Sequence, residues 1–100
     1  MIDLTIKVKY KIKYTNCFKQ NYKKIRKQGK DVEKLKYVIN KLANGLDLEE
    51  KYKNHLLTDS KDYKKCFECH IEPDWLLIYQ YIDNELVLLL VATGSHSELF

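Results

Sequence analysis

Prolines, glycines, cysteines and long apolar runs are all scarce in this chain. One Pro and three Gly among 100 residues leave no room for a long disordered linker. The longest apolar run, Leu86 to Ala92, has seven residues, which is strand length and too short to span a membrane. Three cysteines, an odd number, argue against a disulfide framework. Met1 leads into alternating lysines rather than the apolar block of a signal peptide, so we expect a cytoplasmic protein.

The composition that remains is typical of one folded domain with an uneven charge distribution. Hydrophobic residues make up 45% of the chain and aromatic residues 12%, enough for a single core, so we predict one domain over residues 1–100. Residues 1–45 carry thirteen Lys/Arg and three acids, whereas residues 46–100 carry five Lys and eleven acids. This asymmetry indicates a polyanion or an acidic partner, or else a lysine-rich solvated surface.

The first half of the chain predicts one strand followed by two helices. Residues 2–14 alternate apolar and polar side chains, which is typical of a half-buried strand, and the lysines on its outer face suit a sheet edge. Thr15 or Asn16 can cap a helix that Gly29 ends. Asp31 can cap a second helix, and the short turn between the two makes them a helix hairpin.

The second half predicts a polar connection over residues 46–63 and then three more strands. These strands are expected at 66–72, 74–82 and 86–93, and the last two are apolar on both faces, as central strands are. The order β-α-α-β-β-β predicts an α+β fold. We expect a mainly antiparallel four-stranded sheet with the two-helix hairpin packed on one face.

The three histidines of the chain are candidate catalytic residues. His70 lies on the polar face of the strand predicted at 66–72, together with Glu68, and Asp74 begins the next strand. His96 follows the last strand, and His55 lies in the polar connection. Imidazoles take and give protons near neutral pH. On a basic chain these residues indicate acid–base chemistry on an anionic substrate, such as RNA cleavage, which needs a base and an acid on opposite sides of the phosphorus.

The segment Cys66-Phe67-Glu68-Cys69-His70 matches the c-type haem attachment pattern. On a strand, however, its two cysteines point to opposite faces, and the only methionine of the chain is Met1. The same geometry disfavours zinc, which needs four ligands in a compact turn. We therefore expect no metal and no cofactor.

Three segments resemble the YafQ branch of the RelE/ParE toxin superfamily, and the resemblance runs from about Tyr10 to the C-terminus. It implies a β-α-α-β-β-β fold, in agreement with the order derived from periodicity. It also implies a toxin of a type II toxin–antitoxin system, which cleaves mRNA in the ribosomal A site and is neutralised by a co-encoded antitoxin that wraps it. The segments are Asn54-His55-x-Leu57, Glu68-Cys69-His70-Ile71-Glu72-Pro73-Asp74-Trp75-Leu76-Leu77-Ile78-Tyr79 and Thr93-Gly94-Ser95-His96-Ser97-Glu98-Leu99-Phe100.

Carried over residue by residue, the resemblance implies a set of catalytic residues and a set of substrate-binding residues. His96 would be the general acid, and His70 with Asp74 would activate the 2′-hydroxyl. His55 would orient the phosphate. Trp75 and Phe100 would shape the base site. Lys53, Lys64 or Lys65 would take the place of phosphate-binding arginines that the family has and this chain lacks.

Two positions depart from the family pattern. The family commonly has arginine where this chain has Phe67 and Ala92. Arginine is the preferred bidentate phosphate ligand, and its loss can weaken transition-state stabilisation by about 2–4 kcal/mol. We hypothesise that Ala92 is an attenuating change, natural or engineered, and that restoring arginine there increases growth arrest.

The resemblance also implies the partners of the chain. They are a cognate antitoxin, mRNA and the 70S ribosome, with no membrane contact, and the chain alone would be a monomer that forms a hetero-oligomer with the antitoxin. Its basic half would face rRNA and the acidic antitoxin. Two alternatives remain. One is a non-catalytic toxin like the ParE branch that poisons gyrase, although that branch lacks the histidines, and the other is a small basic RNA-binding module.

Overall fold

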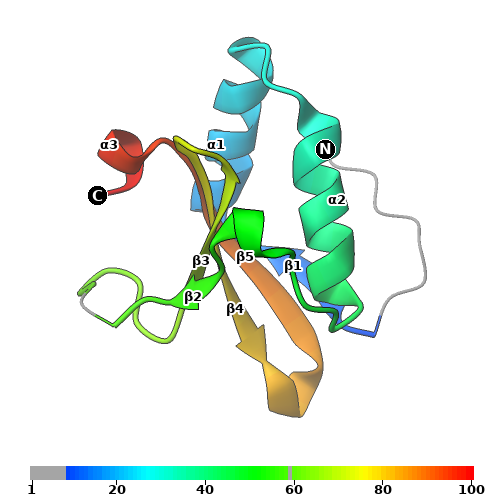
Figure 1. The fold of residues 1–100 in the computed structure, drawn as a ribbon. Helices are drawn as coiled ribbons and strands as arrows, with labels where there is room; N and C mark the ends of the chain where they lie inside the picture. The colour runs from blue at the N-terminus through cyan, green and yellow to red at the C-terminus, as the bar shows by residue number, and fades with distance from the viewer. Residues whose placement is uncertain (1–8, 59) are drawn as a thin grey trace.

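The computed structural model describes residues 9–58 and 60–100, which form an α+β fold (Figure 1). The described helices are α1 (Asn16–Lys27), α2 (Val32–Ala43) and α3 (His96–Leu99). The described strands are β1 (Lys11–Tyr14), β2 (His55–Leu56), β3 (Phe67–Glu72), β4 (Trp75–Ile82) and β5 (Val87–Gly94). Short 3₁₀ turns are η1 (Glu50–Tyr52) and η2 (Asp83–Glu85).

The five strands form one mixed sheet in the order β1-β5-β4-β3-β2. β1 runs parallel to β5, whereas the other neighbouring pairs are antiparallel. The expected four-stranded sheet was therefore wrong in detail, because β2 forms within the predicted polar connection and β1 adds a parallel pair. The helix prediction was incomplete, since α3 follows the hairpin helices at the end of the chain. Residues 2–8 of the predicted first strand lie outside the described residues.

Both hairpin helices begin at the predicted caps. The Thr15 hydroxyl accepts the Phe18 N–H at 3.0 Å and donates to the Val91 carbonyl at 2.6 Å, so this one side chain caps α1 and fixes it to β5. The Asp31 carboxylate accepts the Glu33 N–H at 3.0 Å and caps α2. Capping thus sets where each helix starts relative to the sheet.

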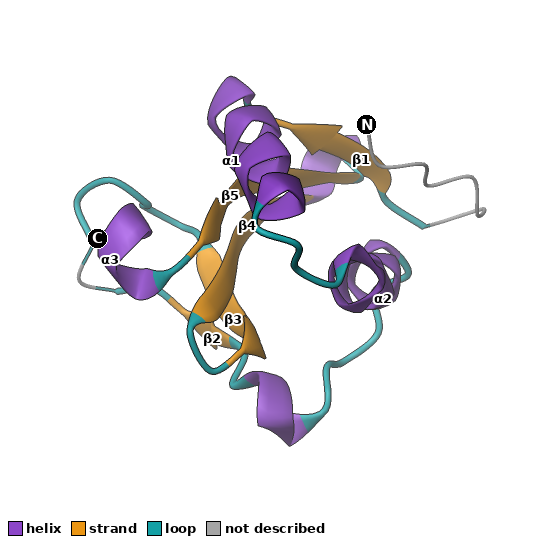
Figure 2. Cartoon of the chain, turned by 90° about the horizontal axis from the view of Figure 1, so that it is seen from above, coloured by secondary structure: helices purple, strands orange, loops and turns teal. Residues whose placement is uncertain are grey.

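The sheet is apolar on both faces, and each face packs against a different part of the chain. One face packs against α1 and α2 through a large core that includes Phe18, Leu35, Cys69, Trp75 and Tyr79. The other face carries a smaller cluster of Cys66, Ile78 and Ala92, on which Leu57, Tyr63 and Leu99 pack. Figures 1 and 2 both place α3 on the side of the sheet away from α2.

None of the helices in the described part of the chain is both long enough and apolar enough to cross a bilayer.

Candidate active site

An open groove of about 400 Å³ lies between β2 and α3. It brings together residues that are far apart in the sequence, because β2 pairs with β3 while α3 follows β5. Two of the three histidines, a buried carboxylate and an exposed aromatic ring share this groove. Its lining residues are His55, Leu56, Leu57, Thr58, Ser60, Glu68, His96 and Phe100.

Glu68 is the centre of a three-residue polar cluster. It lies directly opposite His55 in the β2–β3 pairing, and only 6% of its surface is exposed. Its Oε1 atom is 3.6 Å from Nε2 of His55 and 3.3 Å from Nε2 of His70. One carboxylate oxygen therefore faces two imidazoles, and it stabilises positive charge on either of them.

The second ring nitrogen of each imidazole fixes its tautomer. Nδ1 of His55 is 2.7 Å from the Lys53 carbonyl oxygen, and Nδ1 of His70 is 3.3 Å from the Pro73 carbonyl oxygen. A carbonyl oxygen only accepts, so we assign the hydrogen to Nδ1 in both rings. In the neutral form each Nε2 then carries a lone pair and can accept a proton, and the resulting imidazolium faces Glu68.

His96 enters the groove from the first turn of α3. Its ring stacks on that of Phe100, with centroids 4.9 Å apart and planes inclined by 29°. Its backbone N–H donates to Oδ1 of Asp74 at 3.1 Å. Asp74 is thus bound to the start of α3 and is not part of the Glu68 cluster, so its observed contact positions His96.

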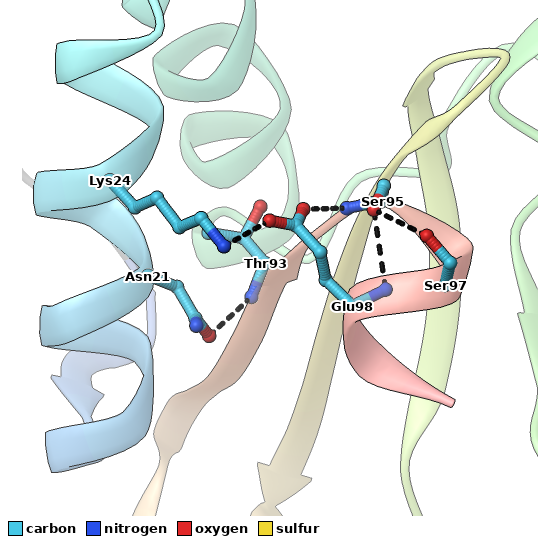
Figure 3. A network of polar contacts seen from close by, with 6 residues as sticks. All are labelled: Asn21, Lys24, Thr93, Ser95, Ser97 and Glu98. Atoms are coloured by element: carbon cyan, nitrogen blue, oxygen red, sulfur yellow. Dashed lines mark hydrogen bonds and ion pairs between the residues drawn. The ribbon is translucent and has the colours of Figure 1, made fainter.

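A polar network ties α3 to α1 (Figure 3). Glu98 accepts the Ser95 N–H at 2.8 Å, and the Ser95 hydroxyl accepts the Glu98 N–H at 3.3 Å, which completes a capping box. Lys24 on α1 lies 2.5 Å from Oε2 of Glu98. The hydrogen bond from Lys24, followed by those from Ser95, lowers the pKa of Glu98 from 4.5 to about 2. The side-chain oxygen of Asn21 on α1 also accepts the N–H of Thr93, near the end of β5, at 3.1 Å.

His70 and Lys53 line a second groove of about 420 Å³, which also includes Lys34 and Lys51. His70 thus lines the second groove, while its partner Glu68 lines the first. Glu72, at the end of β3, pairs with Lys34 on α2 at 2.8 Å, after an irregularity in the strand between His70 and Glu72.

Trp75 and two of the candidate lysines are placed apart from the groove. Trp75 has no exposed surface, and its indole N–H donates to the Thr93 hydroxyl at 3.0 Å, so it lies in the core and not in the lining of the groove. It supports the end of β5 from within the core. Lys64 and Lys65 are exposed in the turn before β3 and line neither groove.

The two family arginine positions hold packed apolar side chains. Phe67 stacks on Tyr79 with ring centroids 5.5 Å apart, on the core side of β3. Ala92 has no exposed surface and packs with Cys66 and Ile78. Neither side chain can bind a phosphate, so cationic stabilisation in this site must come from lysine or imidazolium.

Glu68 is the residue that sequence reasoning missed. The alternation of β3 placed it correctly on the same face as His70, but a strand of two residues, such as β2, has no periodicity to reveal that His55 pairs beside it. A buried acid between two histidines was thus visible only after the pairing of β2 was known.

Comparison with known proteins identifies relatives of this chain. The family profile described as "Bacterial toxin of type II toxin-antitoxin system, YafQ" matches residues 10–100. The mRNA interferase toxin YafQ of Escherichia coli (strain B / BL21-DE3) is 41% identical over 91 residues, covering 89% of this chain and 94% of the relative. The crystal structure of the E. coli DinJ–YafQ complex is 39% identical, with a TM-score of 0.81 over 91% of this chain and 98% of that chain. A metal-bound toxin from Helicobacter pylori is 41% identical, with a TM-score of 0.85 over 91% and 99% of the two chains.

The H. pylori structure raises the question of whether this site fits a metal ion. Among the described residues, no group of three or more His, Cys, Asp or Glu side chains is arranged to hold one. The Nε2 atoms of His55 and His70, which a metal would need, instead face the same oxygen of Glu68. As placed, these residues do not fit a metal ion, and we assign no step to one.

Proposed function

The chain belongs to the YafQ family of type II toxin–antitoxin toxins, and from this membership and the groove we propose how it acts as an mRNA interferase. It is a toxin and an endoribonuclease, and a cognate antitoxin is its partner. We propose that it cleaves mRNA in the A site of the 70S ribosome by acid–base attack of the 2′-hydroxyl, which would place it in the cytoplasm. Membership in this family favours the nuclease over the gyrase-poison and RNA-binding alternatives.

His55 is the base in this proposal. Its Nδ1–H is held by the Lys53 carbonyl, which leaves Nε2 with a lone pair in a groove that also contains His96. Nε2 takes the proton of the 2′-hydroxyl, and the imidazolium that forms is stabilised by the Glu68 carboxylate. His70 faces the same oxygen of Glu68, so the carboxylate can also stabilise an imidazolium at His70, and His70 can replace His55 as the base.

His96 is the acid. As O2′ bonds to phosphorus, the bond from phosphorus to O5′ breaks, and O5′ takes a proton from the His96 imidazolium. The products are a 2′,3′-cyclic phosphate and a 5′-hydroxyl. Stacking on Phe100 holds the imidazole ring of His96 in place for this transfer.

Substrate binding uses the remaining exposed groups. The Phe100 side chain is exposed beside His96, where a neighbouring base can stack on it at about 1–3 kcal/mol per base. Lys53, next to His70, supplies positive charge for the phosphate. In this proposal Lys64 and Lys65 meet flanking RNA, and the basic residues of α1 meet rRNA or the antitoxin. We expect a monomer that becomes a hetero-oligomer with its antitoxin.

One observation carries the proposal: Glu68, His55, His96 and Phe100, from three separate segments, line a single groove. Toeprinting of a translated mRNA tests it. The wild-type chain should cut at codon-phased positions only when ribosomes are present, and His96→Gln should leave the transcript intact. Gln20→Ala, at an exposed position on α1, is the matched control and should cut like the wild type. Equal cleavage by the wild type and His96→Gln would end the assignment of His96 as the acid.

A further inference from the structure

The segment between β2 and β3 covers the apolar cluster on the α3 side of the sheet. Leu57 and Tyr63 pack on Cys66, Ile78 and Ala92. The segment is fixed at its base, because the Leu57 N–H donates to the Cys66 carbonyl at 2.8 Å and the Cys66 N–H donates to the Tyr63 carbonyl at 3.2 Å. Tyr63 is therefore held in a turn whose backbone is tied to the sheet.

Tyr63 contacts the last residues of the chain in two ways. Its hydroxyl donates to the Leu99 carbonyl at 3.1 Å. Its ring meets the Phe100 ring edge-on, with centroids 5.5 Å apart and planes inclined by 75°. The Phe100 ring in turn stacks on His96. A continuous series of contacts thus runs from Tyr63 through Phe100 to the imidazole.

A helix of four residues needs such contacts. A single turn is unstable alone, since nucleation fixes several residues for one hydrogen bond, and its terminal carbonyls have no partner within the helix. Asp74, Ser95, Glu98 and Lys24 hold the beginning of α3. The Leu99 carbonyl lies at its other end, and there Tyr63 supplies the donor.

We infer that Tyr63 is a positioning residue for the reaction: it fixes the end of α3 and the Phe100 ring, and thereby the orientation of the His96 imidazole. This inference rests on the proposed function, in which His96 and Phe100 act on RNA. Tyr63 itself lies half-buried outside the residues that line the groove, so it acts through its neighbours. Burial, with smaller contributions from nearby ionisable groups, raises the pKa of Tyr63 above its ordinary value of 10.0, so the hydroxyl keeps the hydrogen that it donates.

Two substitutions separate the contributions of the hydroxyl and the ring. Tyr63→Phe removes only the hydrogen bond to Leu99 and should lower the single-turnover cleavage rate on ribosomes about threefold to tenfold. Tyr63→Ala also removes the contact with Phe100 and should lower it further. Because Tyr63 touches neither RNA nor ribosome in this proposal, the affinity for ribosomes should stay within about twofold of wild type. Tyr14→Phe, at an exposed tyrosine on β1, is the matched control and should leave the rate unchanged.

Nuclear magnetic resonance gives a readout that does not require activity. The His96 ring protons feel the ring current of Phe100, so their shifts should move in Tyr63→Phe and more in Tyr63→Ala, while those of His55 and His70 stay in place. If Tyr63→Ala fails to fold, Tyr63→Phe decides the matter. Wild-type His96 shifts and a wild-type rate in Tyr63→Phe would overturn the inference, as would equal disturbance of all three histidines. Should the wild-type chain fail to cleave mRNA, the proposed function fails, whereas the shifts still report whether Tyr63 controls His96.

Discussion

Replacing Glu68 with glutamine should slow cleavage without unfolding the chain. Glu68→Gln keeps the shape of the side chain and an oxygen acceptor but removes the negative charge that faces His55 and His70 at 3.6 and 3.3 Å. A solvent-exposed ion pair contributes about 0.2–1 kcal/mol. The His55 side chain is 50% exposed, whereas Glu68 is buried, so we take the upper value of about 1 kcal/mol. That corresponds to a rate about fivefold slower.

The assay is single-turnover cleavage of ribosome-bound mRNA, measured across pH. In the wild type, the base must be neutral and the His96 acid must be protonated, so the rate should pass through a maximum as the pH is raised. Without the carboxylate the imidazolium that forms in the reaction loses the charge that faces it, and the maximal rate should therefore be lower in Glu68→Gln. Glu85→Gln, at an exposed position in η2, is the matched loss of charge and should leave both rate and profile unchanged. A Glu68→Gln variant with the wild-type rate and profile would refute the role of the cluster in proton transfer.

Three further substitutions test the surroundings of the groove. Asp74→Asn keeps an acceptor for the His96 N–H and should cleave nearly as fast as wild type, whereas Asp74→Ala loses a hydrogen bond of about 1 kcal/mol and should be about fivefold slower in the same assay; equally slow variants would instead make the Asp74 carboxylate a proton acceptor. Because the pKa of Glu98 is lowered from 4.5 to about 2, its contribution to stability is present above about pH 4.5 and is lost as the pH falls toward 2. Glu98→Gln should therefore lower the free energy of unfolding by at most about 1 kcal/mol at neutral pH, with a slightly lower Tm. The difference in Tm between the variant and the wild type should become smaller in acid; a difference that is constant with pH would contradict this. Ala92→Arg should raise the cleavage rate per folded molecule. It should also lower the stability of the fold by about 1–3 kcal/mol, because the position is fully buried, so thermal denaturation is used to determine the folded fraction. An unchanged cleavage rate per folded molecule would discard the attenuation hypothesis.

Periodicity and capping predicted most of the regular structure. The observed bounds of α1, α2, β3, β4 and β5 lie within one or two residues of the predicted ones, because the helices begin at polar caps, β3 alternates, and β4 and β5 are continuous apolar runs. The parallel pairing of β1 with β5 was missed, since alternation gives a strand two faces but no direction. The strand β2 was missed because it spans two residues and is held by its pairing with β3.

In the site too, local sequence features were predictable, whereas contacts between distant segments were not. The three histidines and Phe100 were proposed from residue type and from the resemblance, and each of them lines one of two grooves. Their partners were not found, because they depend on contacts between distant segments. Glu68 faces His55 only through the β2–β3 pair, and Trp75 could be assigned to the core only once its indole was seen to bond Thr93.

The groove lies between the shortest strand and the shortest α-helix of the described residues. β2 has two residues and α3 has four, and neither length is stable without tertiary contacts. The large core under α1 and α2 involves neither of them directly. Substitutions that loosen β2 or α3 should then separate His55 from His96 while the core stays folded, so activity can be lost with little change in the main unfolding transition.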